Sequence, residues 1–192
     1  MPKLEYLGDV YRPGDDTWLL IDLIDAVKPR GELCVDLGAG SGVLGLYTLL
    51  NGSCDRVVFI DVSEDAVASI KVNVFLNNVV HRSLVVLSDA ISLRNGVADI
   101  VLANPPYLPA YSSTIVDIAT EGGIEGYETI LYFLEYASSV LKPGKELFIV
   151  WSSLSKPEVV ERYLELHGFR IVDTMHKHFF YETLIASRCV KL

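Results

Sequence analysis

The chain has no apolar run that approaches the roughly 20 residues needed for a membrane-spanning helix. Its first residues, Met1–Glu5, carry none of the features of a signal peptide, so we expect a cytoplasmic protein that does not enter a membrane. Cysteine is also scarce, since the three residues lie far apart and show no Cys-x-x-Cys spacing. We therefore predict no metal site and no disulfide framework, and expect the cysteines to be small buried apolar side chains.

Positive charge is the second shortage. Sixteen Lys and Arg residues stand against 25 Asp and Glu residues, which gives a formal net charge of −9. A domain that grips nucleic acid usually carries a basic stripe, and no Lys/Arg cluster is visible in the sequence. The charge balance thus argues against DNA or RNA as a partner.

Apolar residues, in contrast, are abundant. They make up 51% of the 192 residues, and the mean hydropathy is +0.34. Such a composition suits a parallel sheet that is covered by helices on both faces. The length predicts one domain over residues 1–192, in which residues 1–30 form a helical lead-in to the first strand.

Strand and helix patterns alternate along the chain. Helices are predicted at 43–50, after Ser63, at 127–141 and at 157–166, and strands at 32–37, 56–60, 84–87, 97–103, 146–151, 169–175 and 179–189. This βαβ alternation predicts an α/β fold with a doubly wound, Rossmann-like sheet. The last two strands predict a hairpin, so the seven-stranded, mostly parallel sheet should have an antiparallel edge.

A glycine-rich loop, Asp36–Gly42, separates the first strand from the following helix. Glycines at this place let the backbone turn tightly and approach a ligand closely. A dinucleotide fingerprint can be placed on Gly40, Gly42 and Gly45, but it starts late and brings Asp36 near the pyrophosphate, where like charges repel. S-adenosylmethionine fits better, because its cationic amine and sulfonium attract a carboxylate. The glycines of the loop, Gly38 and Gly40 among them, can cradle its chain.

Acidic residues end the first three strands of the predicted sheet. Asp36 can lie near the methionine end of the cofactor, and Asp61 can accept from both ribose hydroxyls. Asp89 can accept from the adenine amino group, with Ala90 beside the ring. One such residue alone is often a helix cap or turn residue. Three of them on one rim predict a binding site for S-adenosylmethionine.

The tetrapeptide Asn104-Pro105-Pro106-Tyr107 follows the strand 97–103. Its chemistry suits methylation of a nitrogen on a flat, conjugated group, whose delocalised lone pair makes it a poor nucleophile. The Asn104 oxygen and the Pro105 carbonyl can accept from the N–H groups, and the prolines stiffen the turn. The Tyr107 ring offers a face for the planar group. We predict that Asn104, Pro105 and Tyr107 are catalytic residues.

With these motifs, the chain resembles the HemK-like glutamine methyltransferases, and most of all their short archaeal and eukaryotic branch. The combination is specific, whereas the tetrapeptide alone also occurs in adenine-N6 methyltransferases. The resemblance rests on 9–17, the loop at Asp36, Asp61, 104–107, Gly122, Gly123, Gly126 and 181–184. Asp36 stands where several relatives have glutamate, which shortens the reach of the carboxylate but keeps its charge.

The resemblance implies a class I methyltransferase fold and a glutamine substrate in the Gly-Gly-Gln loop of a peptide chain release factor. It also implies a small zinc-binding activator protein, and it places the apolar third strand, 84–87, at a sheet edge where a partner could pair. Two alternatives stay open: an adenine-N6 methyltransferase on DNA or RNA, and a protein lysine methyltransferase. The residues implied to contact the cofactor are Thr17, Asp36, Gly38, Asp61, Asp89, Ala90 and Asn104.

Overall fold

The computed structural model describes residues 1–89, 96–109 and 123–192. Seven strands form one sheet in the order β3-β2-β1-β4-β5-β7-β6, in which β7 runs antiparallel to both neighbours and the other pairs are parallel. The predicted doubly wound sheet with an antiparallel edge is therefore confirmed. The strands are β1 Gly31–Leu37, β2 Cys54–Asp61, β3 Ser83–Leu87, β4 Ala98–Ala103, β5 Leu141–Ser152, β6 Phe169–His178 and β7 Thr183–Lys191.

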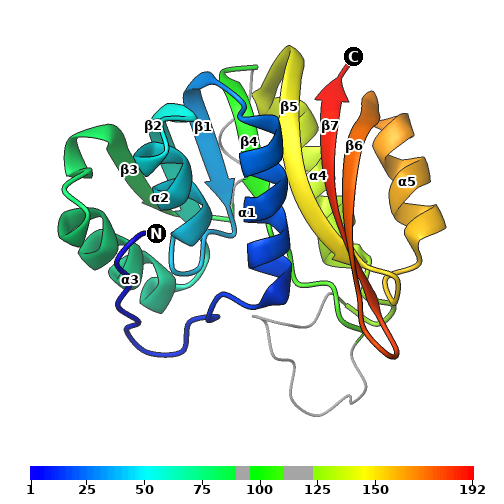
Figure 1. Ribbon diagram of the computed structural model, residues 1–192, viewed down its shortest axis with the longest axis horizontal. Coiled ribbons are helices and arrows are strands. Elements are labelled where there is room, and N and C mark those ends of the chain that lie inside the picture. Colours follow the sequence, from blue (N-terminus) through cyan, green and yellow to red (C-terminus); the bar gives the residue numbers. More distant parts are fainter. Residues whose placement is uncertain (90–95, 110–122) are drawn as a thin grey trace.

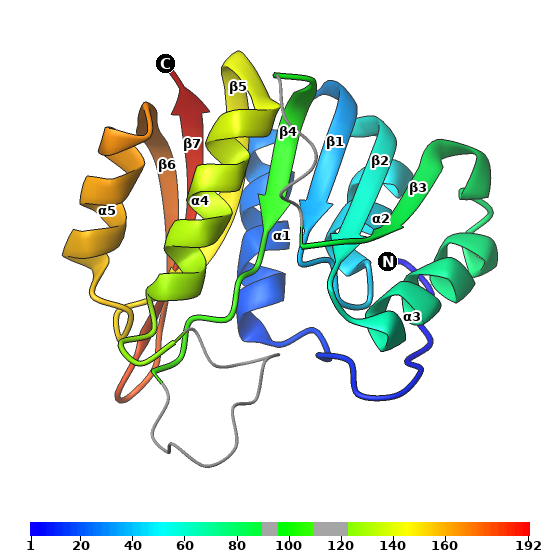
Figure 2. The same ribbon diagram turned by 180° about the vertical axis from the view of Figure 1, so that it is seen from behind.

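Helices cover both faces of the sheet (Figures 1 and 2). Three of them, α1, α2 and α3, lie on one face, and α4 and α5 lie on the other. None of the described helices is long and apolar enough to cross a membrane. The helices are α1 Asp15–Val27, α2 Val43–Leu50, α3 Glu64–Leu76, α4 Glu128–Val140 and α5 Pro157–Leu166, with a single 3-10 turn at Val80–Arg82.

The two faces of the sheet carry two apolar cores. Strand β4 serves both, because alternate side chains of a strand point to opposite faces: Ile100 and Leu102 pack under α1 and α2, while Val101 and Ala103 pack under α4. All six residues of β4 are buried. This burial explains the run of apolar residues in the sequence, and it fixes the end of β4, where Asn104 follows.

The segment before α1 is extended, so only part of the predicted helical lead-in is a helix. This N-terminal arm, residues 3–9, runs along α3 (Figures 1 and 2). Side chains four residues apart on α3 accept backbone N–H groups from alternate residues of the arm at 2.7 to 3.0 Å. The pairs are Asp65 with Asp9, Ser69 with Leu7, Asn73 with Glu5, and Asn77 with Lys3.

The strands near the end of the chain differ from the prediction in their bounds. The hairpin turn lies at 179–182, where Phe179 N–H donates to the Glu182 carbonyl at 2.7 Å, and not before residue 179. Strand β5 begins at Leu141, although Pro143 and Gly144 suggested a break. Its register against β4 shifts at this point, and that irregularity accommodates the two residues.

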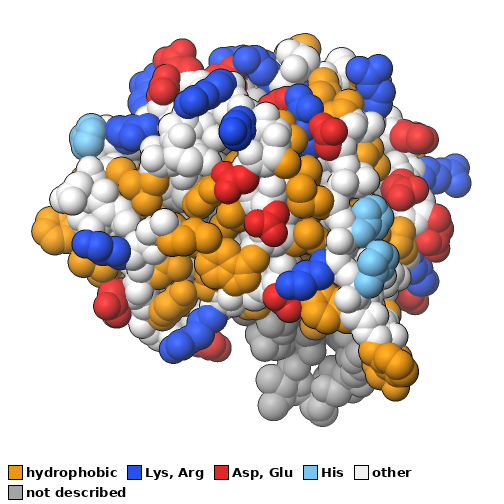
Figure 3. All heavy atoms as spheres, viewed as in Figure 1, with side chains coloured by type: hydrophobic (Ala, Val, Ile, Leu, Met, Phe, Trp, Pro, Cys, Tyr) orange, Lys and Arg blue, Asp and Glu red, His pale blue; other side chains and the backbone are white. Residues whose placement is uncertain are grey.

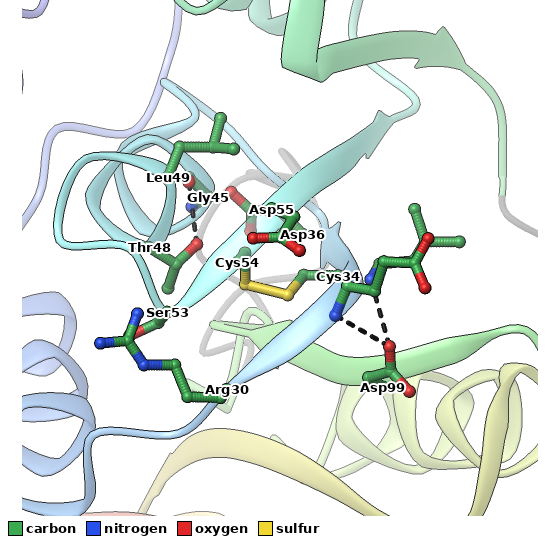
Figure 4. Close-up of a disulfide and its surroundings, with 12 residues drawn as sticks. Arg30, Cys34, Asp36, Gly45, Thr48, Leu49, Ser53, Cys54, Asp55 and Asp99 are labelled. Carbon is green, nitrogen blue, oxygen red and sulfur yellow. Dashed lines mark hydrogen bonds between the residues drawn. A yellow bond between two sulfur atoms is a disulfide. The ribbon is translucent and has the colours of Figure 1, made fainter.

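A disulfide joins Cys34 of β1 to Cys54 of β2, with 6.0 Å between the two Cα atoms (Figure 4). The prediction that all three cysteines are only small buried apolar residues was therefore wrong for this pair. A sequence separation of 20 residues hid their proximity, because α2 lies between them and returns the chain to the adjacent strand. Cys189 is free and buried, as expected.

Candidate active site

A cavity of about 1070 Å³ opens at the carboxyl ends of the parallel strands, where ligands of open α/β sheets bind. The loop after β1, the ends of β2 and β3, and the first residue after β4 all contribute to its lining. Among the residues predicted from the sequence, the lining includes Thr17, Gly38, Gly40, Asp61, Asp89 and Asn104. Ala90, also predicted, lies outside the described residues.

The glycine loop forms one wall of this cavity. Gly38 and Gly40 have φ of +62° and +54°, a left-handed conformation that glycine adopts without a side-chain penalty. A Cβ on Gly38 would lie 2.7 Å from Cζ of Phe133, so the ring of α4 packs directly on the loop. A Cβ on Gly40 would meet nothing within 4 Å. The loop thus presents bare backbone to the cavity at Gly40.

Asp61 ends β2 and is tied to the glycine loop. Its Oδ2 accepts the backbone N–H of Gly40 at 2.8 Å, and its Oδ1 accepts the N–H of Ser63 at 2.9 Å. The carboxylate is half-buried and lines the cavity. Each carboxylate oxygen has a further lone pair, so Asp61 can still accept from ligand hydroxyls.

Asp36 occupies a different place from the other two acids. It is only 1% exposed and is absent from the described cavity lining. Its Oδ2 accepts the N–H of Gly45 in the first turn of α2 at 2.8 Å. Burial raises the pKa of this carboxyl to about 8. The hydrogen bond from Gly45 acts in the lowering direction, and the charge of the nearby Asp61 acts in the raising direction. Asp36 therefore ties the end of β1 to the first turn of α2.

Asp89 follows β3 and is exposed at the cavity. The hydroxyl of Tyr132, on α4, donates to the Asp89 backbone carbonyl, which links this edge of the cavity to α4. Burial raises the pKa of Tyr132, with Asp89 contributing, so the hydroxyl keeps its proton and remains a donor. This hydrogen bond from α4 thus holds the backbone segment that carries the Asp89 carboxylate.

The tetrapeptide after β4 forms the part of the wall beside the glycine loop, because Leu37 and Ala103 are register partners on adjacent strands. Asn104 lines the cavity, and its Nδ2 donates to Thr17 Oγ1 of α1 at 3.1 Å. Pro106 also lines it, whereas Pro105 is buried and lies outside the lining. The contact between Asn104 and Thr17 joins two predicted residues that are 87 positions apart in the sequence.

Tyr107 is half-buried behind this wall. Its hydroxyl donates to Asp16 Oδ2 at 3.0 Å, and the hydroxyl of Tyr11 donates to the same carboxylate at 2.9 and 3.0 Å. Burial, together with the negative charge of Asp16, raises the pKa of both tyrosines far above the ordinary value. Both hydroxyls therefore stay protonated and act as donors. The ring of Tyr107 is held in one orientation.

Several lining residues were missed in the sequence. The N-terminal arm contributes Asp9 and the segment between the arm and α1 contributes Tyr11, while α3 contributes Asp65, and α4 contributes Thr129 and Phe133. A signal existed for α3, because Asp65, Ser69, Asn73 and Asn77 repeat every four residues and mark a polar stripe. From the sequence alone, a polar stripe on a helix is expected to face solvent, because the sequence does not reveal the arm that covers it.

The charged side chains in the described lining of the cavity are all negative. Its described lining includes four carboxylates, on Asp9, Asp61, Asp65 and Asp89, and no Lys, Arg or His. A second cavity, at the amino ends of the strands, has charges of both signs in its lining: Arg30, Lys142 and Lys145 together with Glu32, Asp55 and Asp99. Lys and Arg side chains are frequent along the upper edge of Figure 3, opposite the end where the parallel strands finish. The site therefore suits a cationic ligand better than a phosphate.

Comparison with known proteins agrees with this geometry. The profile of the methyltransferase small domain matches residues 14–180. The chain belongs to the methyltransferase small domain family. A Methanocaldococcus jannaschii chain, named as a candidate protein N5-glutamine methyltransferase, is 31% identical over 88% of this chain and 85% of its own length. The predicted methyltransferase and its resemblance to the HemK-like branch are confirmed.

Two further relatives match this methyltransferase over most of its length. The catalytic subunit of the eRF1 methyltransferase of Schizosaccharomyces pombe, mtq2, is 26% identical over 99% of this chain and 93% of its own. The solved Mtq2–Trm112 complex of E. cuniculi, which methylates the termination factor eRF1, contains a chain that is 26% identical. That match has a TM-score of 0.69 and covers 96% of this chain and 100% of the other.

Proposed function

We propose that this methyltransferase transfers a methyl group from S-adenosylmethionine to the side-chain nitrogen of a glutamine, in the Gly-Gly-Gln loop of a peptide chain release factor. The orientation of the Asn104 amide carries the proposal. Its Nδ2 is engaged by Thr17, which leaves Oδ1 as an acceptor at the cavity. An acceptor at this place matches a substrate that presents N–H groups, and the eRF1 methyltransferases named above support a protein substrate.

The residues around the cavity fit S-adenosylmethionine. Gly38 and Gly40 leave room for the ligand chain, while Asp61 and Asp89 can accept from its ribose and its adenine. Thr17 lies beside Asn104 in the lining. The carboxylates of the lining favour a positively charged ligand. When bound, S-adenosylmethionine supplies a methyl group that is electrophilic because it is attached to a positively charged sulfur.

The protein's own part in the reaction is to position and shape the substrate amide. Asn104 Oδ1 and the Pro105 carbonyl would accept its two N–H groups and draw the nitrogen lone pair out of conjugation. The face of the Tyr107 ring would support the flat amide. No general base is needed before attack, because the nitrogen gives up a proton to water readily once it is alkylated. Positioning of this kind contributes most of the rate gain.

The edge of the sheet formed by β3 offers a place for an activator protein to bind. Strand β3 is an edge strand, and Leu84 and Leu87 are 58% and 51% exposed. The Trm112 partner in the E. cuniculi complex supports an activator, and we propose a small zinc-binding protein that adds a strand to β3. Leu84→Lys should reduce copurification with the co-expressed activator, and Val172→Lys on the opposite edge strand β6 should not. Equal recovery of the activator with both variants would reject this edge.

Because a release factor acts on ribosomes, we propose that the enzyme works in the cytoplasm. A disulfide is unusual in that reducing compartment. Both Cys34 and Cys54 are fully buried, so thiol reductants would not reach their sulfur atoms in the folded chain.

Transfer assays with three substrates test the function. A purified release factor should accept labelled methyl from S-adenosylmethionine, and a variant with Gln of the Gly-Gly-Gln loop changed to Ala should not. A duplex oligonucleotide should accept little, because the acidic rim repels its phosphates. A lysine-rich protein should also accept little, because a lysine amine is not planar and does not suit a corner shaped for an amide. Methylation of the oligonucleotide without methylation of the release factor would replace this proposal by the adenine-N6 alternative.

A further inference from the structure

We propose that Asp16 is a positioning residue of the transfer site: through the Thr17 hydroxyl it holds the Asn104 amide with Oδ1 turned toward the substrate. The inference deepens the proposed function and rests on it for the identity of the substrate. Asp16 lies behind the wall of the cavity, outside its described lining. It would therefore act on the substrate only through its neighbours.

Asp16 is a buried carboxylate that collects hydrogen bonds. It is 4% exposed, and it is not part of any of the ion pairs found among the described residues. Four donors replace a cation: the hydroxyls of Tyr11, Tyr107 and Thr17, and the backbone N–H of Thr17. A carboxylate has no proton to give, so toward each of these four donors it can only accept.

The direction of each hydrogen bond then follows along the chain of contacts. Thr17 has one hydroxyl proton, and it must point to Asp16 Oδ1 at 3.1 Å, because the carboxylate has no proton to give. The Thr17 oxygen can therefore only accept in its contact with Asn104. The partner at 3.1 Å must be the Nδ2 donor of Asn104, and its Oδ1 consequently faces the other way.

Tyr107 connects the same carboxylate to the tetrapeptide by a second route. Its hydroxyl donates to Asp16 Oδ2, while Thr17 is served by Oδ1, so the two oxygens orient two parts of the corner. Burial and the charge of Asp16 keep the pKa of Tyr107 well above its ordinary range, so this donor does not titrate near neutral pH. One carboxylate thus orients both the amide of Asn104 and the ring of Tyr107.

Replacement of Asp16 by Asn shows what the charge does. Asn has nearly the same shape, but an NH2 group replaces one of the two acceptor oxygens. An NH2 group in the place of Oδ1 would donate to the Thr17 oxygen, and the Asn104 amide would then flip so that Nδ2 faces the substrate. The backbone N–H of Thr17, which needs an acceptor, favours the NH2 group in the place of Oδ2. There the Tyr107 hydroxyl would lose its acceptor, and the ring would lose the hydrogen bond that orients it.

The kinetic test compares Asp16→Asn with Asp15→Asn. Asp15 is the adjacent acid, half exposed and paired with Lys177 at 2.7 Å, so its variant controls for loss of charge on the first turn of α1. Asp16→Asn should lower kcat on the release factor on the order of 100-fold, the size seen when one oriented group is lost. Asp15→Asn should stay within about threefold of the parent chain. Calorimetry should give an S-adenosylmethionine Kd for both within about threefold of the parent value.

Two substitutions at Thr17 separate relay from packing. Thr17→Ser keeps the hydroxyl and should keep most of kcat, whereas Thr17→Val keeps the shape, loses the hydroxyl and should lose kcat as Asp16→Asn does. If Thr17→Val turns over at the rate of Thr17→Ser, the relay is wrong. If Asp16→Asn keeps kcat within about threefold of the parent, or loses it only in proportion to folded protein measured by circular dichroism, Asp16 has no positioning role.

Nuclear magnetic resonance reads the amide without any substrate. The Asn104 side-chain NH2 signals, assigned by their loss in Asn104→Asp, should exchange slowly with water in the parent chain and in Asp15→Asn. They should exchange faster in Asp16→Ala, which leaves the Thr17 proton without its acceptor, and unchanged exchange there would overturn the inference. If the parent chain fails to methylate a release factor while this exchange difference is present, the proposed function falls and the role of Asp16 in orienting Asn104 stands.

Discussion

The backbone N–H of Gly40 donates a 2.8 Å hydrogen bond to Asp61 Oδ2, so the end of β2 is fastened to the loop after β1. This contact joins the two parts of the cavity wall that the sequence predicted separately. It also means that Asp61 has two tasks, since the same carboxylate supports the loop and faces the ligand.

Asp61→Asn should weaken binding of S-adenosylmethionine by about tenfold or more, which corresponds to about 1.4 kcal/mol. The amide keeps the shape of the side chain but removes the negative charge and one acceptor oxygen. Asp55→Asn is the matched control, because Asp55 lies near the start of the same strand and is exposed. Titration calorimetry measures both, and equal affinities for the two variants would show that Asp61 does not hold the ligand.

Gly38→Ala should destabilise the fold more than Gly144→Ala does. Both glycines have positive φ, +62° and +76°, so both substitutions meet the left-handed penalty of about 1–2 kcal/mol. Only the new Cβ at residue 38 would clash, at 2.7 Å from Phe133 Cζ, whereas nothing lies within 4 Å at residue 144. The difference between the two, measured by urea unfolding, isolates the contact with α4.

The double variant Gly38→Ala with Phe133→Ala checks that explanation. Removing the ring should recover part of the stability lost at residue 38, so the two changes should be less than additive. Strict additivity would mean that the ring does not press on the loop.

Removal of the disulfide by Cys34→Ala with Cys54→Ala should lower the free energy of unfolding by about 3 kcal/mol, as expected for a loop of this length. Cys189→Ala is the control for loss of a buried sulfur and should have a smaller effect. Alkylation of the denatured, unreduced chain followed by mass spectrometry should label Cys189 alone. Labelling of Cys34 and Cys54 as well would show that the bond is not formed.

The stability of the chain should depend on pH in opposite directions through Asp36 and Asp99. Burial raises the pKa of Asp36 to about 8, so between about pH 4 and 8 the folded state keeps a proton that the unfolded state has lost. The free energy of unfolding should therefore fall as pH rises through this range. Asp36→Asn should remove that decline and gain on the order of a few kcal/mol relative to the parent chain at pH 8.

Asp99 supplies the contrast. Burial alone would raise its pKa, but hydrogen bonds from Lys142, Lys145 and two backbone N–H groups hold it at about 2. Its contribution to stability is present above about pH 4 and is lost as pH falls toward 2. Asp99→Asn should therefore lose stability at neutral pH and converge on the parent in acid, as measured by thermal unfolding between pH 2 and 8. Parallel pH profiles for Asp36→Asn and Asp99→Asn would contradict both assignments.

The parallel part of the sheet was predictable because each of its strands is a short apolar run with a polar residue at or just after its end. Asp61 and Asn104 mark two such ends, and their lining of one cavity follows from the topology. Asp36 is the last residue but one of β1, the same kind of strand, but its carboxylate accepts the N–H of Gly45. The first turn of α2 therefore takes up this side chain before it can reach the cavity. A strand end predicts the rim, but the direction of the side chain depends on the loop that follows.

The contacts that the sequence did not disclose join segments far apart in the chain. The disulfide, the ladder between the N-terminal arm and α3, and the bonds of Tyr107 and Thr17 to Asp16 all depend on how the helices return to the sheet. Spacing rules describe a single helix or strand, so they detect one half of such a contact. The other half becomes visible only when the packing is known.

Mass spectrometry of a release factor co-expressed with this chain tests the central claim most directly. The account predicts one added methyl group on the glutamine of the Gly-Gly-Gln loop with the parent chain, and none with Asn104→Ala, a variant that should still bind S-adenosylmethionine. An unmodified glutamine with the parent chain and its activator, or full modification by Asn104→Ala, would contradict it.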